Sequence, residues 1–165
     1  MKANLKIAQT NGYKYALKGT IYTELIVLFI VLSSITSAAR SATGAFSMIV
    51  GLVGAIGCVN IVNFIVLTLF FAYFLGKKAG VSILKNRNNY LLKSYKTGFL
   101  IVIYSTLTAS ITALVINFFK GELPVDWFIL FILRPIVWLF CLSFIPIFIA
   151  GSWYGVRLID KTQSR

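Results

Sequence analysis

Four long apolar blocks dominate this sequence, and they decide what the chain can fold into. Each block exceeds the roughly 18–20 residues that a helix needs to cross the hydrocarbon layer of a membrane. Only 12% of the 165 residues are charged, against about 25% in a typical soluble domain. The sequence therefore predicts an all-α integral membrane protein, a bundle of four transmembrane helices in a single membrane domain. The predicted crossings cover residues 21–39, 46–75, 98–119 and 127–154.

Basic segments flank these crossings. Residues 1–20 carry lysines at a nearly regular four-residue spacing, which predicts a basic amphipathic helix on the membrane surface. The Asn11-Gly12 pair is expected to interrupt that helix. Residues 76–96 form a basic connection between the second and third crossings, and residues 155–165 form a basic tail. We call residues 1–20 the lead-in. Its lysines are Lys2, Lys6, Lys14 and Lys18.

The distribution of lysine and arginine predicts the orientation. The lead-in, the middle connection and the tail hold 13 of these residues, whereas the other two loops hold only Arg40 and Lys120. Cytoplasmic loops carry the excess of basic residues, so we expect both termini on the cytoplasmic side of a cell inner membrane. The net charge of +12 then indicates contact with an anionic inner leaflet and no nucleic acid. The candidate headgroup contacts are Lys77, Lys78, Lys85, Arg87, Lys93 and Lys96.

Catalytic chemistry is not indicated. The chain has no histidine, which removes the commonest acid–base group and metal ligand. None of its four acidic residues lies near the middle of a predicted crossing, and only Glu122 and Asp126 are close in sequence. Intramembrane aspartyl chemistry needs paired carboxylates within reach of each other. We therefore expect a protein that is not an enzyme and that has no metal and no cofactor.

Small residues in the second crossing form a candidate helix-contact face. Their three- and four-residue spacings let helix backbones approach closely, which is how helices associate in lipid. One interpretation is packing against the first or third helix of the same chain. The other is a seam for a second copy or for another membrane protein. The residues of this face are Ser47, Gly51, Gly54, Ala55 and Gly57.

Polar side chains near the centres of the second and third crossings form part of a candidate buried polar site. Asn60 and Asn63 share one helix face, and an amide that faces lipid is costly. Ser105, Thr108 and Thr112 share a face of the third crossing. We expect interhelical hydrogen bonds between the two sets, with a polar lining for a solute path as the alternative.

Two charges fall within the crossings. Arg134 lies seven residues past Trp127, roughly 10 Å deep at 1.5 Å per residue, and it completes the candidate buried polar site. We expect it to extend outward to the surface, with a buried anion site or an acidic partner residue as the alternative. Glu24 lies about one turn inside the first crossing. It is expected to pair with Lys18 or with a lysine of the connection.

The two halves of the chain align when shifted by 79 residues. The shift matches Gly19 with Gly98 and Gly76 with Gly155. This pattern indicates either a parallel repeat of two crossings each or two unrelated helical hairpins with basic ends.

Three function classes remain. The first, which the sequence favours, is a non-enzymatic subunit or immunity-type accessory partner of a larger membrane system that acts through helix–helix contacts. The outline of four helices with a basic middle loop is similar in architecture alone to immunity proteins of pore-forming colicins. The alternative is a small permease or channel subunit that works as an oligomer, although a proton-coupled carrier normally needs a mid-membrane carboxylate or histidine. The third is a lipid-surface protein.

Overall fold

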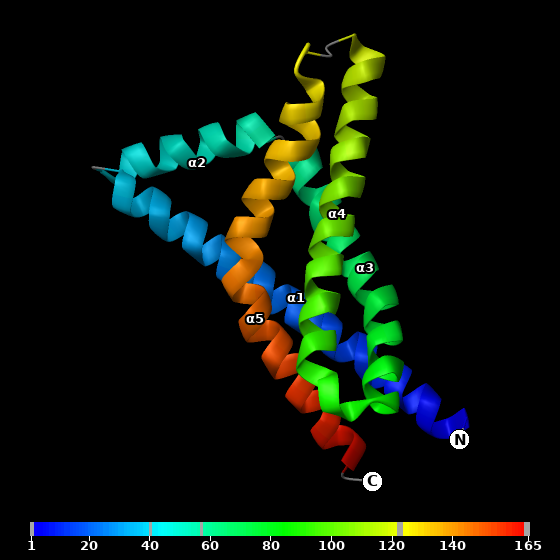
Figure 1. Ribbon diagram of the computed structural model, residues 1–165. Coiled ribbons are helices and arrows are strands. Elements are labelled where there is room, and N and C mark those ends of the chain that lie inside the picture. Colours follow the sequence, from blue (N-terminus) through cyan, green and yellow to red (C-terminus); the bar gives the residue numbers. More distant parts are fainter. Residues whose placement is uncertain (1, 40, 57, 122–123, 164–165) are drawn as a thin grey trace.

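The chain folds into a bundle of helices (Figure 1). The computed structural model describes residues 2–39, 41–56, 58–121 and 124–163, and it describes side chains in these ranges except at 2–4, 52–60, 87 and 161–163. All regular elements in the described ranges are helical. They are α1 (Lys2–Ala38), α2 (Ala42–Ile56), α3 (Cys58–Lys85), the 3-10 turn η1 (Arg87–Asn89), α4 (Tyr90–Lys120), the π-helical turn η2 (Ile129–Leu133) and α5 (Arg134–Gln163).

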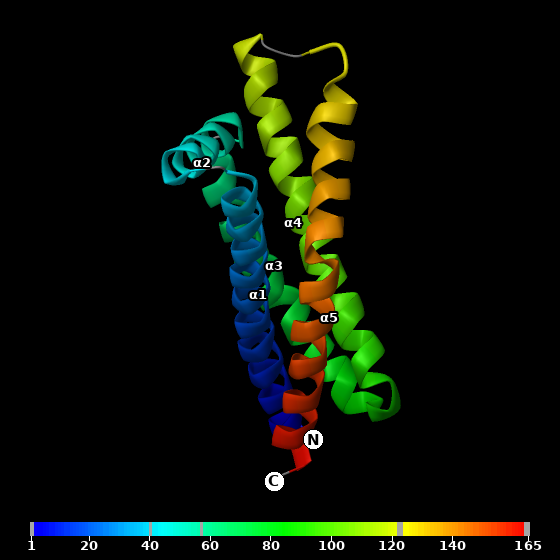
Figure 2. The ribbon, with the colours of Figure 1, turned by 90° about the vertical axis from the view of Figure 1, so that its left-hand side faces the viewer.

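Four helical stretches are long and apolar enough to cross a membrane, which confirms the predicted class. They pack in a ring, because α1 contacts α3 and α5 while α4 contacts the same two helices. Figures 1 and 2 show both termini and the α3–α4 turn at one end of this ring. The four stretches are Leu5–Ala38, Ile61–Lys85, Tyr90–Lys120 and Ile129–Asp160.

Helix α1 runs without interruption through the lead-in, so the break expected at Asn11-Gly12 is wrong. Gly12 is buried where α1 crosses α3, and a Cβ built on it would lie only 2.9 Å from the Gly80 Cα. A glycine inside a helix costs about 1 kcal/mol relative to alanine, but here it lets two backbones pack closely. Ala8 and Ala16, one turn to either side, are also buried. The lead-in is therefore part of the bundle.

The basic connection predicted over residues 76–96 is mostly helical. Helix α3 continues to Lys85 and α4 begins at Tyr90, with only a short turn between them. The reason is tertiary packing. Gly76 and Gly80 pack directly against α1, and these contacts stabilise the helical form of α3. The lysines of this segment thus project from helices and not from a flexible loop.

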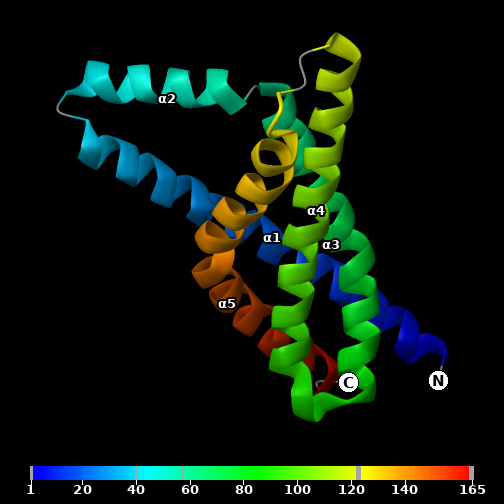
Figure 3. The ribbon, with the colours of Figure 1, turned by 45° about the horizontal axis from the view of Figure 1, so that its top comes forward.

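Helix α2 projects sideways from the bundle. The crossing predicted over residues 46–75 is divided, because α2 ends at Ile56 and α3 begins at Cys58. Figures 1 and 3 show α2 running back from the outer end of α1 to the start of α3, at a large angle to α3. Helix α2 contacts α1 and α3. Its apolar residues Phe46 and Val50 are exposed.

The start of the fourth crossing contains a π-helical turn. The backbone N–H of Arg134 bonds to the carbonyl of Ile129, five residues back. Pro135 follows, and proline has no N–H to complete an ordinary α-helical turn. Beyond it α5 continues to Gln163, so most of the predicted tail is helical as well.

The packing tests part of the suspected repeat. Gly76 packs closely on α1 and Gly155 packs closely on Ser94 of α4, as two equivalent halves would require. Gly19 and Gly98, however, both face α5, whereas a two-fold repeat would turn Gly98 toward α3. The repeat therefore stays a hypothesis.

Candidate functional site

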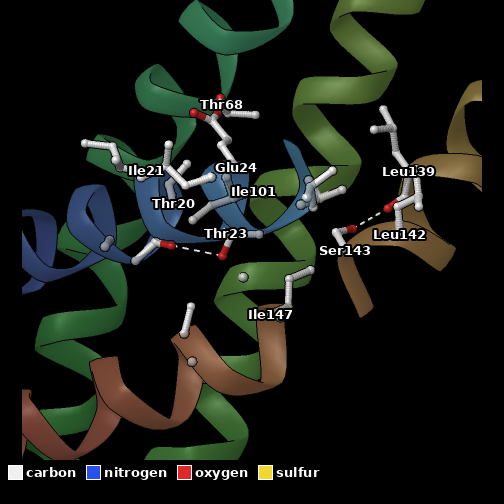
Figure 4. Close-up of a pocket in the computed structure, with 18 of the residues that line it drawn as sticks. Thr20, Ile21, Thr23, Glu24, Thr68, Ile101, Leu139, Leu142, Ser143 and Ile147 are labelled. Carbon is white, nitrogen blue, oxygen red and sulfur yellow. Dashed lines mark hydrogen bonds between the residues drawn. The ribbon is translucent and has the colours of Figure 1, made fainter. Parts of the chain in front are cut away.

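A cavity of about 510 Å³ lies between the four long helices (Figure 4). Its walls are mostly apolar, with leucine, isoleucine and valine side chains from α1, α3, α4 and α5. On α1 the lining residues recur at helical spacing between Ala16 and Val31. That face carries small, hydroxyl-bearing and apolar residues together with one carboxylate, Glu24.

Glu24 is joined to α3 across this cavity. The hydroxyl of Thr68 donates a hydrogen bond to Oε1 of Glu24, and Figure 4 shows the two side chains pointing toward one another. Thr68 itself is 2% exposed and Glu24 is half-buried. This contact links two helices through an ionisable side chain, which is rare in a membrane interior.

The pair lies well inside the apolar part of the bundle. Thr68 precedes Lys77 by nine residues, which is about 13 Å along α3. Glu24 follows Lys18 by six residues, about 9 Å along α1. Both residues fall within candidate membrane spans. Glu24 therefore lies less than two helical turns beyond the exposed Lys18, and its place near the lysine-rich end of the first crossing stays a prediction.

The expected pairing of Glu24 with Lys18 is not what the structure shows. Six residues of α-helix turn about 120° short of two full turns, so the two side chains leave α1 in different directions. Lys18 is exposed on the outside of the bundle, whereas Glu24 lines the cavity. Thr68 takes the place of the predicted basic partner.

Hydroxyl groups form most of the remaining polar lining, and four of them donate to carbonyls of their own helices. Thr23 donates to the carbonyl of Gly19 at 2.9 Å, and Thr97 donates to that of Lys93 at 2.7 Å. Such bonds leave the oxygen lone pairs as the free polar feature of each hydroxyl. The same back-bonding is made by Ser94 to Tyr90 and by Ser143 to Leu139.

A second hollow of about 290 Å³ adjoins the cavity between α1 and α5. Leu25 and Ala150 line both hollows. Tyr22 and Leu25 are 49% and 56% exposed, so this second hollow is on the outer surface of the bundle. Trp153 closes one side of it and packs edge-on against Tyr22, with ring centroids 5.5 Å apart. Leu25 and Ala150 thus lie between the cavity and the outer surface of the bundle at this point.

The candidate helix-contact face lies on α2, away from the cavity. Ser47 is exposed, and a Cβ built on Gly51 would meet nothing within 4 Å. Around Gly51 the helix therefore makes no close packing with the described part of its own chain. The surroundings of Gly54 and of the Ala55 side chain, and Gly57 as a whole, lie outside what the structure describes.

The candidate buried polar site is dispersed. Ser105 is buried, and Ser105, Thr108 and Thr112 donate to their own helix, at 2.6 to 2.8 Å. Asn63 is half-buried on α3. None of these four lines the cavity. Arg134 is exposed at the start of α5, and Asn60 lies outside the described side chains.

The candidate headgroup lysines divide into two groups. Lys93 bonds to the carbonyls of Ser82 and Asn86, which end α3. Lys77 lies over the ring of Tyr73, 3.8 Å from its centroid. Lys93 and Lys77 therefore make their contacts with other residues of the chain. A second group, Lys78, Lys85 and Lys96, is exposed, and the side chain of Arg87 lies outside the described residues.

Comparison of the chain with protein-family models, with curated proteins and with solved structures finds no match. We therefore infer the function from the cavity and from the residues around it.

Proposed function

We propose that this protein is a small, non-enzymatic membrane permease, or a subunit of one, that holds a hydrophobic solute in the cavity between α1, α3, α4 and α5. The observation that carries the proposal is the Glu24 carboxyl within a candidate membrane span, in an apolar cavity that all four long helices line. Ligand sites typically enclose about 300–1,000 Å³ and place a few polar groups among apolar ones. Ionisable residues inside membranes are costly and mark solute or ion pathways.

The orientation forms part of the proposal. Both termini and the basic α3–α4 turn share one end of the bundle, and 13 basic residues belong to those segments in the sequence. We place this end in the cytoplasm, beside an anionic inner leaflet.

Two single-cysteine variants test this orientation, in a background where Cys58 and Cys141 are changed to alanine. Asn88 is exposed in the α3–α4 turn, and Val125 is exposed in the turn at the opposite end. We expect a membrane-impermeant thiol reagent to leave Asn88→Cys unlabelled in intact cells and to label it after lysis. Val125→Cys is expected to be labelled in intact cells. The reverse pattern would overturn the orientation.

The proposed permease is tested by transport into vesicles. Purified protein is reconstituted, and the uptake of benzyltrimethylammonium, benzenesulfonate and erythritol is compared with that of protein-free vesicles. We expect at least one solute to enter faster with the protein present. Val27→Phe, which fills the cavity wall, should abolish that uptake. Val137→Phe adds the same bulk to the exposed face of α5 and should leave it unchanged. Absence of cavity-dependent uptake for all three solutes would contradict the proposal.

Helix contact with a second copy or with another membrane protein is the second candidate function. The observation that favours it is the open space around Gly51 on the projecting helix α2. Gly51→Leu should then abolish co-purification or crosslinking of the partner, while Val137→Leu on α5 should not. Unchanged association in Gly51→Leu would count against this candidate.

A further inference from the structure

The lining of the cavity contains an acidic side chain and no basic one, in contrast to the positive net charge of the chain. The protein carries a net charge of +12, yet no lysine or arginine is among the described residues that line the cavity. Glu24 and Tyr154 are the titratable groups among those residues. An ionised Glu24 would repel an anionic solute and would attract a cation strongly, because the apolar walls screen charge poorly.

The uncharged polar groups of the lining also favour a cation. The lining hydroxyls of Thr23, Ser94, Thr97 and Ser143 donate to their own helices, so they present oxygen lone pairs to a ligand. Pro146 has no N–H for the carbonyl of Leu142, and Leu142 is a lining residue. The lining thus offers acceptors to a ligand that brings positive charge or donors.

Thr68 can form a hydrogen bond with Glu24 whether the carboxyl is ionised or protonated. Its single hydroxyl hydrogen has two acceptors within reach, Oε1 of Glu24 and the carbonyl of Ile65 at 2.8 Å. When Glu24 is ionised, the hydroxyl can donate to the carboxylate. When Glu24 is protonated, the acid can donate to Thr68, which then turns its hydrogen to Ile65. Both forms of the carboxyl therefore have a hydrogen-bond partner.

We infer that the cavity binds hydrophobic organic cations, namely quaternary ammonium ions and protonated amines, with Glu24 as their counter-charge. This inference rests on the proposed permease function, because it names the solute class of the same cavity. The apolar walls accommodate the hydrocarbon body of the solute, and the rings of Phe64 and Tyr154 add surfaces to which a cation is attracted. Thr68 acts as a positioning residue for the carboxylate.

The test compares two aromatic solutes of opposite charge in the same vesicles. We expect cavity-dependent uptake of benzyltrimethylammonium and none of benzenesulfonate. Glu24→Gln keeps the shape of the side chain and should reduce uptake of the cation at least tenfold. Asp126→Asn removes a carboxylate from the exposed outer turn and should leave the uptake unchanged. Each variant is first checked for a single folded species in detergent.

Thr68 is tested separately. Thr68→Val should reduce cation uptake about threefold, and Thr68→Ser, which restores the hydroxyl, should recover it. Equal cavity-dependent uptake of both solutes, or full cation uptake by Glu24→Gln, would overturn the inference while leaving the permease in place. If the unmodified protein shows no cavity-dependent uptake of any of the solutes, the proposed function itself is contradicted.

Discussion

Gly12 of α1 and Gly80 of α3 pack backbone against backbone, so closely that a Cβ on Gly12 would lie 2.9 Å from the Gly80 Cα. A methyl group at either position must push the two helices apart, because the atoms it meets belong to the main chain. We expect Gly80→Ala to lower the free energy of unfolding in detergent by about 1–3 kcal/mol. Chemical denaturation followed by circular dichroism measures this change.

The control for that experiment is Gly51→Ala. Gly51 is also helical, but a Cβ there meets nothing within 4 Å, so alanine should be neutral or should stabilise by up to about 1 kcal/mol. Equal destabilisation by both substitutions would show that the close contact between α1 and α3 does not form.

The Glu24–Thr68 hydrogen bond should appear as an energetic coupling. In a double-mutant cycle, we measure the free energy of unfolding in detergent for Glu24→Gln, Thr68→Val and the double variant. We expect an interaction energy of about 0.5–1.7 kcal/mol, as for hydrogen bonds between membrane helices. Repeating the cycle with Asp126→Asn in place of Glu24→Gln should give additive effects. Additivity in both cycles would argue against the bond.

Pro135 should control the π-helical turn at the start of the fourth crossing. Pro135→Ala restores a backbone N–H, so the turn at Ile129–Leu133 is expected to close into an ordinary α-helix. A π-helical turn holds about one residue more than an α-helical turn, so its closure rotates the preceding segment by about 100° relative to α5. In a variant that keeps Trp127 as its sole tryptophan, the fluorescence and quencher access should change. An unchanged spectrum would separate the π turn from the proline.

Gly121 ends α4 with a φ of 71°, a left-handed conformation that side chains disfavour. A Cβ there would meet nothing within 4 Å, so the cost of Gly121→Ala is conformational alone. We expect a loss of about 1 kcal/mol, measured by thermal unfolding. Gly121→Asn, which tolerates this region better, should lose less.

The class of the fold could be predicted from the sequence because it depends on the lengths of apolar blocks. The ends of the helices could not, since they depend on tertiary packing. Asn11-Gly12 and Gly76 resemble loop residues in isolation, and they become helical because α1 and α3 bury them against each other. Nothing in the local sequence around Gly12 reports the presence of Gly80.

The site was missed for a related reason. We expected a lysine partner for Glu24, whereas its side chain faces the cavity and bonds to Thr68 of α3. Small and hydroxyl-bearing residues recur at helical spacing on the lining face between Ala16 and Thr23, and this is the signal from which that face could have been found. The partner Thr68 was not visible, because only the crossing of α1 with α3 brings it to Glu24.

The continuity of α1 also has a mechanical consequence. Its 37 residues form a rod of roughly 55 Å. The rod packs closely on α3 near Gly12 and continues into α2 beyond Ala38. Glu24 lies about 18 Å from Gly12 and Ala38 about 39 Å from it. Gly19 also packs against α5 and Glu24 bonds to Thr68 of α3, so this rod is anchored at three successive levels and carries α2 on its far end.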